Sequence, residues 1–163
     1  MLPADIQPAT AGEDPEGGAV ERMALLVVGE HRFAVAIGRI REIIPAKPYT
    51  SLPGSGPHVC GLINLRGRIV TVVDLGARLG LDPASARPDH SVVIVEHEGR
   101  PAGLAVGEVS RIVDADLSLL GDAADALRAL RIDRDYLLGV GEAGGEVFVA
   151  VDPDRIIAPI LSA

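Results

Sequence analysis

The sequence predicts a mainly β fold of two tandem barrels with about five strands each and a few short helices. Three observations predict this fold. From residue 22 onward, short apolar runs alternate with turns that contain glycine, which is typical of antiparallel hairpins. Helical periodicity is scarce. The second half of the chain also repeats the pattern of the first half, so two copies of one small unit are expected.

The repeat is visible at two offsets along the chain. The shorter offset places Val35-Ala-Ile-Gly38 on Leu104-Ala-Val-Gly107. The longer offset aligns glycines and an aspartate: Gly61 with Gly139, Gly67 with Gly145, and Asp74 with Asp152. Each half therefore contains a hairpin, a third strand, a second hairpin and a short helix. Closing such a unit into a barrel removes its edge strands.

Four hairpins follow one another along the chain. Their strands are expected at 23–28 and 32–37, at 62–65 and 69–73, at 92–95 and 102–106, and at 136–140 and 147–151. Short helices are expected at 74–79 and 122–130, where Asp74 and Asp122 stand at N-cap positions. Asp152 is the repeat equivalent of Asp74, so helix capping is expected in both halves.

Residues 1–21 differ from the rest of the chain. They contain three prolines and five acidic residues but no basic residue, which predicts a disordered acidic tail. Residues 22–163 are expected to form the folded domain. Its first barrel is expected at about 22–80 and its second at about 90–160, with a crossover near 81–89. Exchange of strands between the two barrels stays open as an alternative.

Composition and charge exclude several classes of function. The formal net charge is −8, and outside the tail 15 basic residues face 18 acidic ones. Nucleic-acid binding is therefore not expected, because phosphate backbones are bound through clustered Lys and Arg. The single cysteine, Cys60, cannot form an intrachain disulfide. Because the sequence has no signal peptide and no membrane-length apolar run, we expect a cytoplasmic protein without direct membrane insertion.

The sequence offers little for catalysis or for a cofactor. Residues 139–144 match the dinucleotide pattern G-x-G-x-x-G, but a strand is expected after them, so a hairpin turn is the better interpretation. The four histidines lack ligand spacing and are interpreted as surface or loop residues. Cys60 is interpreted as a buried structural thiol. No catalytic residue, cofactor or metal site is therefore expected.

Arg66 is the residue that the fold alone does not explain. It stands at the tip of a hairpin, and its repeat equivalent is Gly144, so a barrel does not need arginine at this position. Two interpretations stay open. Arg66 is either a solvated turn residue or the anchor of a protein interface, where its planar donors fix the orientation of a partner.

The segment 59–75 reads Val-Cys-Gly-Leu-Ile-Asn-Leu-Arg-Gly-Arg-Ile-Val-Thr-Val-Val-Asp-Leu and resembles the central signature of the CheW-like chemotaxis coupling (adaptor) family. The resemblance extends over about 22–160. It implies two SH3-like barrels, in agreement with the repeat, and a non-enzymatic scaffold in bacterial signal transduction. The sequence departs from the family at Thr71, where proline is common, and at Gly107, where aspartate is frequent.

The resemblance also implies partners and a binding site. Proteins of this family bridge the cytoplasmic tip of a chemoreceptor (a methyl-accepting chemotaxis protein) and the regulatory domain of a chemotaxis histidine kinase. Ile40 and Glu42 correspond to positions that line the receptor-binding groove between the barrels, and Arg66 corresponds to the signature arginine. The protein-binding residues that follow are Ile40, Glu42, Asn64, Arg66, Gly67, Val92 and Ile112. By periodicity alone, the three aliphatic residues fit ordinary barrel core equally well.

Three other functions stay open at this point. Thr71 and Gly107 favour a paralogue with one partner interface that serves a non-flagellar chemosensory pathway, such as surface motility or gene regulation. An enzyme or cofactor-binding barrel would need a polar cluster that the sequence lacks. A detached kinase regulatory domain would share the fold, although the acidic start and short end of the chain favour a stand-alone protein.

Overall fold

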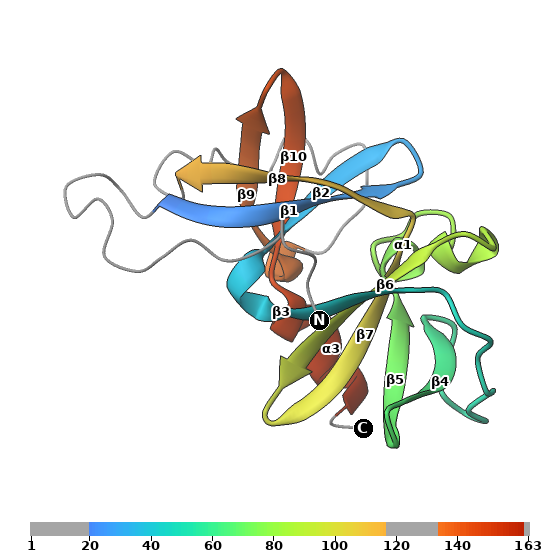
Figure 1. Ribbon diagram of the computed structural model, residues 1–163. Helices are drawn as coiled ribbons and strands as arrows, with labels where there is room; N and C mark the ends of the chain where they lie inside the picture. The colour runs from blue at the N-terminus through green and yellow to red at the C-terminus, as the bar shows by residue number, and fades with distance from the viewer. Residues whose placement is uncertain (1–19, 117–133, 162–163) are drawn as a thin grey trace.

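The computed structural model describes residues 20–116 and 134–161, which form two five-stranded sheets (Figure 1). The strands are β1 (Val20–Val28), β2 (His31–Ala36), β3 (Ile40–Pro45), β4 (Val59–Leu65), β5 (Arg68–Asp74), β6 (Ser91–His97), β7 (Arg100–Val106), β8 (Glu108–Asp116), β9 (Leu137–Ala143) and β10 (Glu146–Val151). We call the sheet with the order β8-β1-β2-β10-β9 the terminal sheet, and the sheet with the order β3-β6-β7-β5-β4 the central sheet. The predicted mainly β fold with two five-stranded units is thus confirmed.

The two sheets do not follow the barrel boundaries expected at about 22–80 and 90–160. The central sheet takes its strands from residues 40–106, and the terminal sheet combines strands from both ends of the chain. The first hairpin of each repeat is therefore exchanged. Phe33 of β2 lies opposite Val149 of β10 in a parallel pair, and Ala102 of β7 lies opposite Thr71 of β5 in the other. These pairs are equivalent under the two offsets of the repeat, so each repeat completes the sheet of the other.

Several strands are buried on both faces, because three apolar clusters fill the molecule. One cluster lies within the terminal sheet, one lies within the central sheet, and the third takes residues from both sheets. In β1, Met23 and Leu25 belong to the first cluster, whereas Ala24 and Leu26 belong to the third. Strands covered on both sides need apolar residues at every position, which explains the continuous apolar runs in the sequence.

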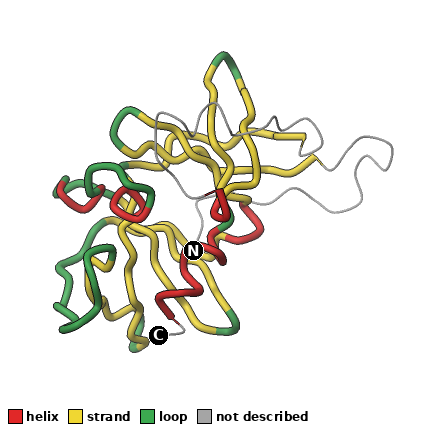
Figure 2. The backbone as a smooth tube through the Cα atoms, turned by 180° about the vertical axis from the view of Figure 1, so that it is seen from behind, coloured by secondary structure: helices red, strands yellow, loops and turns green. Residues whose placement is uncertain are grey.

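The helices are short and begin after the two repeat-related aspartates. Helix α1 (Leu75–Arg78) follows Asp74, and helix α3 (Pro153–Leu161) follows Asp152, whose Oδ1 accepts a hydrogen bond of 3.0 Å from the Asp154 amide. Figure 2 shows α3 alongside strands of the central sheet, near the C-terminus. Three 3₁₀ turns complete the described elements: η2 (Ile37–Arg39), η3 (Ala84–Ala86) and η5 (Arg134–Tyr136). Capping in both halves is thus confirmed.

Two of the expectations fall on residues that the structure does not describe. The helix expected at 122–130 and residues 1–19 of the expected tail lie outside the described ranges. Residues 20–21, which were expected in the tail, belong to β1, where they pair with residues 115–116 of β8. No helix in the described ranges is long and apolar enough to cross a bilayer.

Asp74 joins the end of the central sheet to the crossover that follows it. Its buried carboxylate accepts hydrogen bonds from the amides of Ala77, Ala84 and Ser85 at 3.0, 2.9 and 2.9 Å, and from the Ser85 hydroxyl at 2.6 Å. One side chain thus caps α1 and fixes η3. A buried carboxylate with this many donors is costly to remove, because its partners lose their acceptor.

We therefore predict that Asp74→Ala lowers the free energy of unfolding by about 3 kcal/mol. Urea unfolding monitored by circular dichroism measures this loss. The matched control is Asp82→Ala, because Asp82 is exposed and its carboxylate has no hydrogen bond among the described residues. Equal losses in the two variants would contradict the structural role of Asp74.

Candidate protein-interaction site

The turn between β4 and β5 holds Arg66 in a strained and well-defined position. Arg66 and Gly67 both have left-handed backbone angles, with φ of 52° and 83°. Two such residues form the tight turn whose twist matches a β hairpin. The Asn64 side-chain oxygen accepts a hydrogen bond of 2.9 Å from the Gly67 amide and closes the turn. Asn64 and Gly67 therefore shape the turn that presents Arg66.

Arg66 forms a two-point ion pair with Glu42 of β3. Arg66 Nη1 donates to Glu42 Oε2 at 2.8 Å, and Arg66 Nη2 donates to the other carboxylate oxygen. A paired geometry of this kind fixes both orientation and distance. β3 and β4 are the two edge strands of the central sheet. The ion pair therefore connects edge strand β3 to the turn that follows edge strand β4.

The two members of the pair differ sharply in their exposure to solvent. The Glu42 side chain is 10% exposed, whereas the Arg66 side chain is 67% exposed. The hydrogen bonds from Arg66 lower the pKa of Glu42 to about 2, although burial acts in the opposite direction. The carboxylate raises the pKa of Arg66 in return. Glu42 is thus a fixed anion beneath an arginine whose guanidinium faces solvent.

The pair lies over a hollow with a volume of about 330 Å³ at this end of the central sheet. We call this hollow the central mouth. It is lined by Arg41, Glu42, Leu65, Arg66, Arg68, Val70, Ile94, Val95, Glu96 and Pro101. Val70 and Ile94 belong to the apolar cluster of the central sheet, so the floor of the hollow is apolar and its rim is charged. Such a site accepts an apolar side chain and orients it through polar contacts at the rim.

The structure brings four of the seven expected binding residues together and separates the other three. Glu42, Asn64, Arg66 and Gly67 form the pair and its turn. The aliphatic residues lie elsewhere: Ile40 is buried in the cluster between the sheets, Val92 is buried in the cluster of the central sheet, and Ile112 is half-buried on β8 against the cluster between the sheets. None of these three lines the central mouth. For Ile40 and Val92, the position in the structure is that of barrel core, as the alternative interpretation held.

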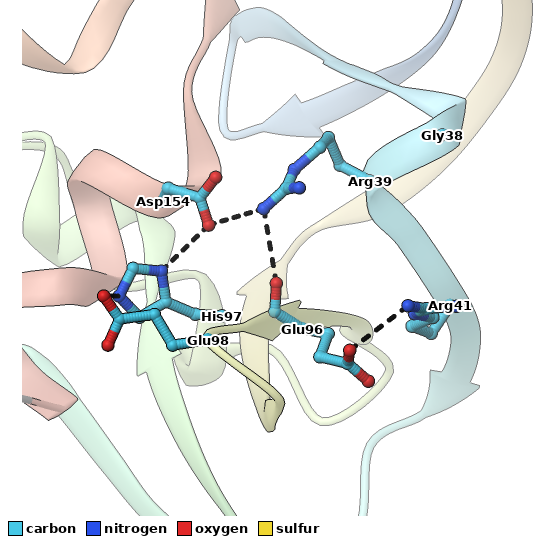
Figure 3. Close-up of a pocket in the computed structure, with 7 residues that line it drawn as sticks. All are labelled: Gly38, Arg39, Arg41, Glu96, His97, Glu98 and Asp154. Carbon is cyan, nitrogen blue, oxygen red and sulfur yellow. Dashed lines mark hydrogen bonds and ion pairs between the residues drawn. The ribbon is translucent and has the colours of Figure 1, made fainter.

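A second polar cluster lies where the two sheets meet (Figure 3). Asp154, at the start of α3, accepts a hydrogen bond of 2.5 Å from Arg39 Nη2 and lies 2.9 Å from His97 Nδ1. Arg39 also donates to the Glu96 carbonyl at 3.3 Å, and Arg41 donates to the Glu96 side chain at 3.2 Å. The cluster ties α3 to the end of β6 in the central sheet and to η2, the turn through which the chain passes from the terminal sheet to the central sheet.

The sequence interpretation missed several of these residues. Arg68 lies in the signature segment but was not among the expected binding residues, and neither were Arg41 and Glu96 of the central mouth. Arg39 and Asp154 are separated by 115 positions in the chain. His90 lies in the loop before β6, in agreement with the interpretation of the histidines as surface or loop residues, but its ring is buried. Its Nε2 lies 2.6 Å from the Tyr49 hydroxyl, and its Nδ1 lies 2.5 Å from the Arg87 carbonyl. Its burial follows from these two partners, because a buried polar ring needs hydrogen bonds at both nitrogens.

The described residues contain no cluster of metal ligands, and their one cysteine is protonated at neutral pH. Across residues 20–116 and 134–161, no three His, Cys, Asp or Glu side chains lie together as metal ligands would. Burial raises the pKa of the Cys60 thiol to about 11, so the thiol is protonated at neutral pH. Because the thiolate is the nucleophile, the protonated Cys60 thiol is a weak nucleophile. Its side chain is half-buried, whereas the sequence interpretation expected a buried thiol.

Comparison with known proteins decides the family. The model of the CheW-like domain matches residues 22–160 of the chain. The chain belongs to the CheW-like family. It is 33% identical over 132 residues to a chemotaxis protein CheW of Rhizobium meliloti, and the match covers 79% of this chain and 82% of that protein. It is 26% identical over 108 residues to the chemotaxis protein CheW of Bacillus subtilis, covering 66% and 69%.

A solved structure supports the fold of this CheW-like chain. The scaffolding protein TtCheW from Thermoanaerobacter tengcongensis superimposes with a TM-score of 0.75, covering 85% of this chain and 93% of that one. The two sequences are 22% identical. The two-barrel fold is therefore shared, in agreement with the SH3-like barrels that the resemblance implied.

The Glu42–Arg66 pair generates a prediction for pH dependence. The folded-state pKa of Glu42, about 2, lies below its ordinary value of 4.5. The pair therefore stabilises the fold above pH 4.5, and this contribution is lost as the pH falls toward 2. We expect Glu42→Gln to lower the free energy of unfolding by roughly 1 kcal/mol at pH 7, and by less at pH 3. Urea titrations at several pH values measure this difference, and Glu30→Gln is the exposed control. A difference that stays constant from pH 6 to pH 3 would contradict the ion pair.

The cluster of Figure 3 generates a prediction for helix α3. Asp154→Ala removes the acceptor shared by Arg39 and His97, so we expect a loss of about 1 kcal/mol and faster amide hydrogen exchange in α3 than in the central sheet. The control is Asp89→Ala, because Asp89 also pairs with an arginine but is 73% exposed. Unchanged exchange in α3 would show that the helix is held by its apolar face alone.

Proposed function

We propose that this CheW-like chain is a non-enzymatic adaptor that couples chemoreceptors to a chemotaxis-type histidine kinase. Its partners would be the cytoplasmic tip of the receptor and the regulatory domain of the kinase. It would act in the cytoplasm and be recruited to receptor arrays at the membrane, without inserting into the bilayer. The observation that carries the proposal concerns Arg66, which lies within the signature segment of the family. Its side chain is exposed and is held in place by the buried carboxylate of Glu42.

The geometry of the pair suits protein recognition. A flexible arginine loses side-chain entropy when a partner fixes it, which weakens binding. Here the Asn64–Gly67 turn and the Glu42 carboxylate hold the guanidinium before any partner arrives. The apolar floor of the central mouth adds contact area next to this fixed donor. These features support a role of Arg66 as an interface anchor.

An adaptor needs two different surfaces, and the repeat provides a second one. The repeat equivalent of Glu42 is Arg111 on β8, which donates to the Ala143 carbonyl at 2.9 Å. A Cβ atom at Gly144, the equivalent of Arg66, would lie 2.8 Å from Arg111 Nη2. The equivalent ends of the two sheets are therefore joined by different chemistry. This difference supports two unlike partners for the two barrels.

The alternative of a paralogue with one lost interface gains no support from Gly107. A Cβ atom at this position would lie 2.5 Å from the Val27 carbonyl oxygen, so a larger residue would force the backbone to move. Glycine at 107 therefore has a packing reason in this chain. The departure from the family at this position does not argue for a missing kinase contact.

The central test is a titration of the full chain against the receptor tip and the kinase regulatory domain, each taken separately. We expect binding to both, with dissociation constants of about 1 μM or weaker for each single contact. Arg66→Ala should weaken binding to at least one partner about tenfold and lower the free energy of unfolding by about 1 kcal/mol or somewhat more, because it leaves the buried Glu42 carboxylate without this partner. Isothermal calorimetry and urea unfolding measure the two effects.

The outcomes separate the candidate functions. Binding to both partners, weakened by Arg66→Ala, would support the adaptor. Binding to one partner alone would favour the specialised paralogue. Binding to neither would reject the proposal, and collapse of the fold in Arg66→Ala would make Arg66 a structural residue and not an interface anchor.

A further inference from the structure

We propose that Arg68 makes the central mouth selective for a partner segment that carries a carboxylate beside its docked apolar side chain. The inference rests on the proposed function, because it takes the central mouth as an interface with a protein partner. It goes beyond that function by assigning a specificity residue and the chemistry that this residue recognises.

The position of Arg68 in β5 directs it toward the central mouth. Successive side chains of a strand point to opposite faces, so Arg68 shares a face with Val70 and not with Ile69. Arg68 and Val70 both line the hollow, whereas Ile69 does not. Arg68 is exposed, and it is the first residue of β5 directly after the turn that presents Arg66. It therefore stands at the rim of the hollow, next to the fixed Arg66–Glu42 pair.

The charges of the rim do not balance. Three arginines and two glutamates line the hollow: Arg41, Arg66, Arg68, Glu42 and Glu96. Arg66 pairs with Glu42 and Arg41 pairs with Glu96, whereas Arg68 forms no ion pair or hydrogen bond with the described residues. The rim thus carries one cation that no described residue neutralises. This local charge is opposite in sign to the net charge of −8 of the whole chain.

The floor of the hollow restricts the kind of anion that fits. Val70, Ile94 and Val95 are buried beneath the rim, and Leu65 and Pro101 add apolar atoms to its walls. A small hydrated anion would leave this apolar surface uncovered. A nucleic acid would need many phosphate contacts, and one unpaired arginine does not provide them. An amphipathic protein segment satisfies both features, with an apolar side chain on the floor and an aspartate or glutamate against Arg68.

The test uses the full chain and the two partners of the proposed function. The variants are Arg68→Gln, which removes the charge, and Arg68→Glu, which reverses it. Lys47→Glu is the matched control, because Lys47 is also exposed and lacks an ion pair among the described residues, but does not line the hollow. We expect Arg68→Gln to weaken binding to one partner about threefold and Arg68→Glu about tenfold or more, with a smaller loss at high salt. Lys47→Glu should change the affinity less than about twofold.

A charge exchange identifies the carboxylate on the partner. Replacing the recognised aspartate or glutamate by lysine should weaken binding to the wild-type chain and restore binding to Arg68→Glu. Equal effects of Arg68→Glu and Lys47→Glu would overturn the inference while leaving the adaptor function intact. If the wild-type chain binds neither partner, the proposed function and this inference both fail. If Arg68→Glu changes only self-association in sedimentation, the occupant is a second copy of this chain, and the inference is overturned.

Discussion

A polar side-chain contact between the two edges of each five-stranded sheet is the constraint on which the candidate site depends. The edge strands of each sheet pair on one side only, and such a contact connects the two edges at one end of the sheet. In the central sheet, the Glu42–Arg66 pair spans from edge strand β3 to the turn that ends β4. In the terminal sheet, Arg111 of β8 reaches the Ala143 carbonyl of β9. Both contacts are polar and lie at the ends of the sheets. The contacts that connect the sheet edges therefore also place polar groups at the surface.

An apolar contact would also connect β3 to the turn after β4. The pair is charged because it both connects these edges and leaves a polar group at the surface. An apolar pair would be buried and could not orient a partner. In the Glu42–Arg66 pair, the carboxylate is buried and the guanidinium is exposed, so Glu42 contributes to the fold while Arg66 stays available for the proposed contact with a partner. The lowered pKa of Glu42 keeps the anion in place across the physiological pH range. Glu42 therefore accepts the hydrogen bonds of Arg66 throughout this pH range.

The sequence predicted the features that depend on neighbouring residues and missed those that depend on distant ones. Hairpins, glycine turns, Asp74 as a cap and the repeat itself follow from short patterns. The exchange of hairpins does not follow from such patterns. The two offsets of the repeat are the same whether a hairpin joins the sheet of its own repeat or the sheet of the other repeat. Ile40 and Val92 were ambiguous because strands buried on both faces lose the alternation that separates core from surface. Arg66 was singled out from sequence, but its pairing with Glu42 appears only when β3 meets the β4–β5 turn.

The exchanged hairpins have a mechanical consequence for an adaptor. Because the terminal sheet contains the first and the last strand, the central sheet is inserted within it, and the chain passes between the two sheets twice, at η2 and at Gly107. The cluster of Asp154, Arg39 and His97 and the apolar cluster between the sheets fix their relative position further. In the proposed adaptor role, this link would hold the two partner surfaces at one spacing, and the gain from engaging both would depend on that spacing matching the assembly. The fold would then contribute a defined geometry between two modest contacts.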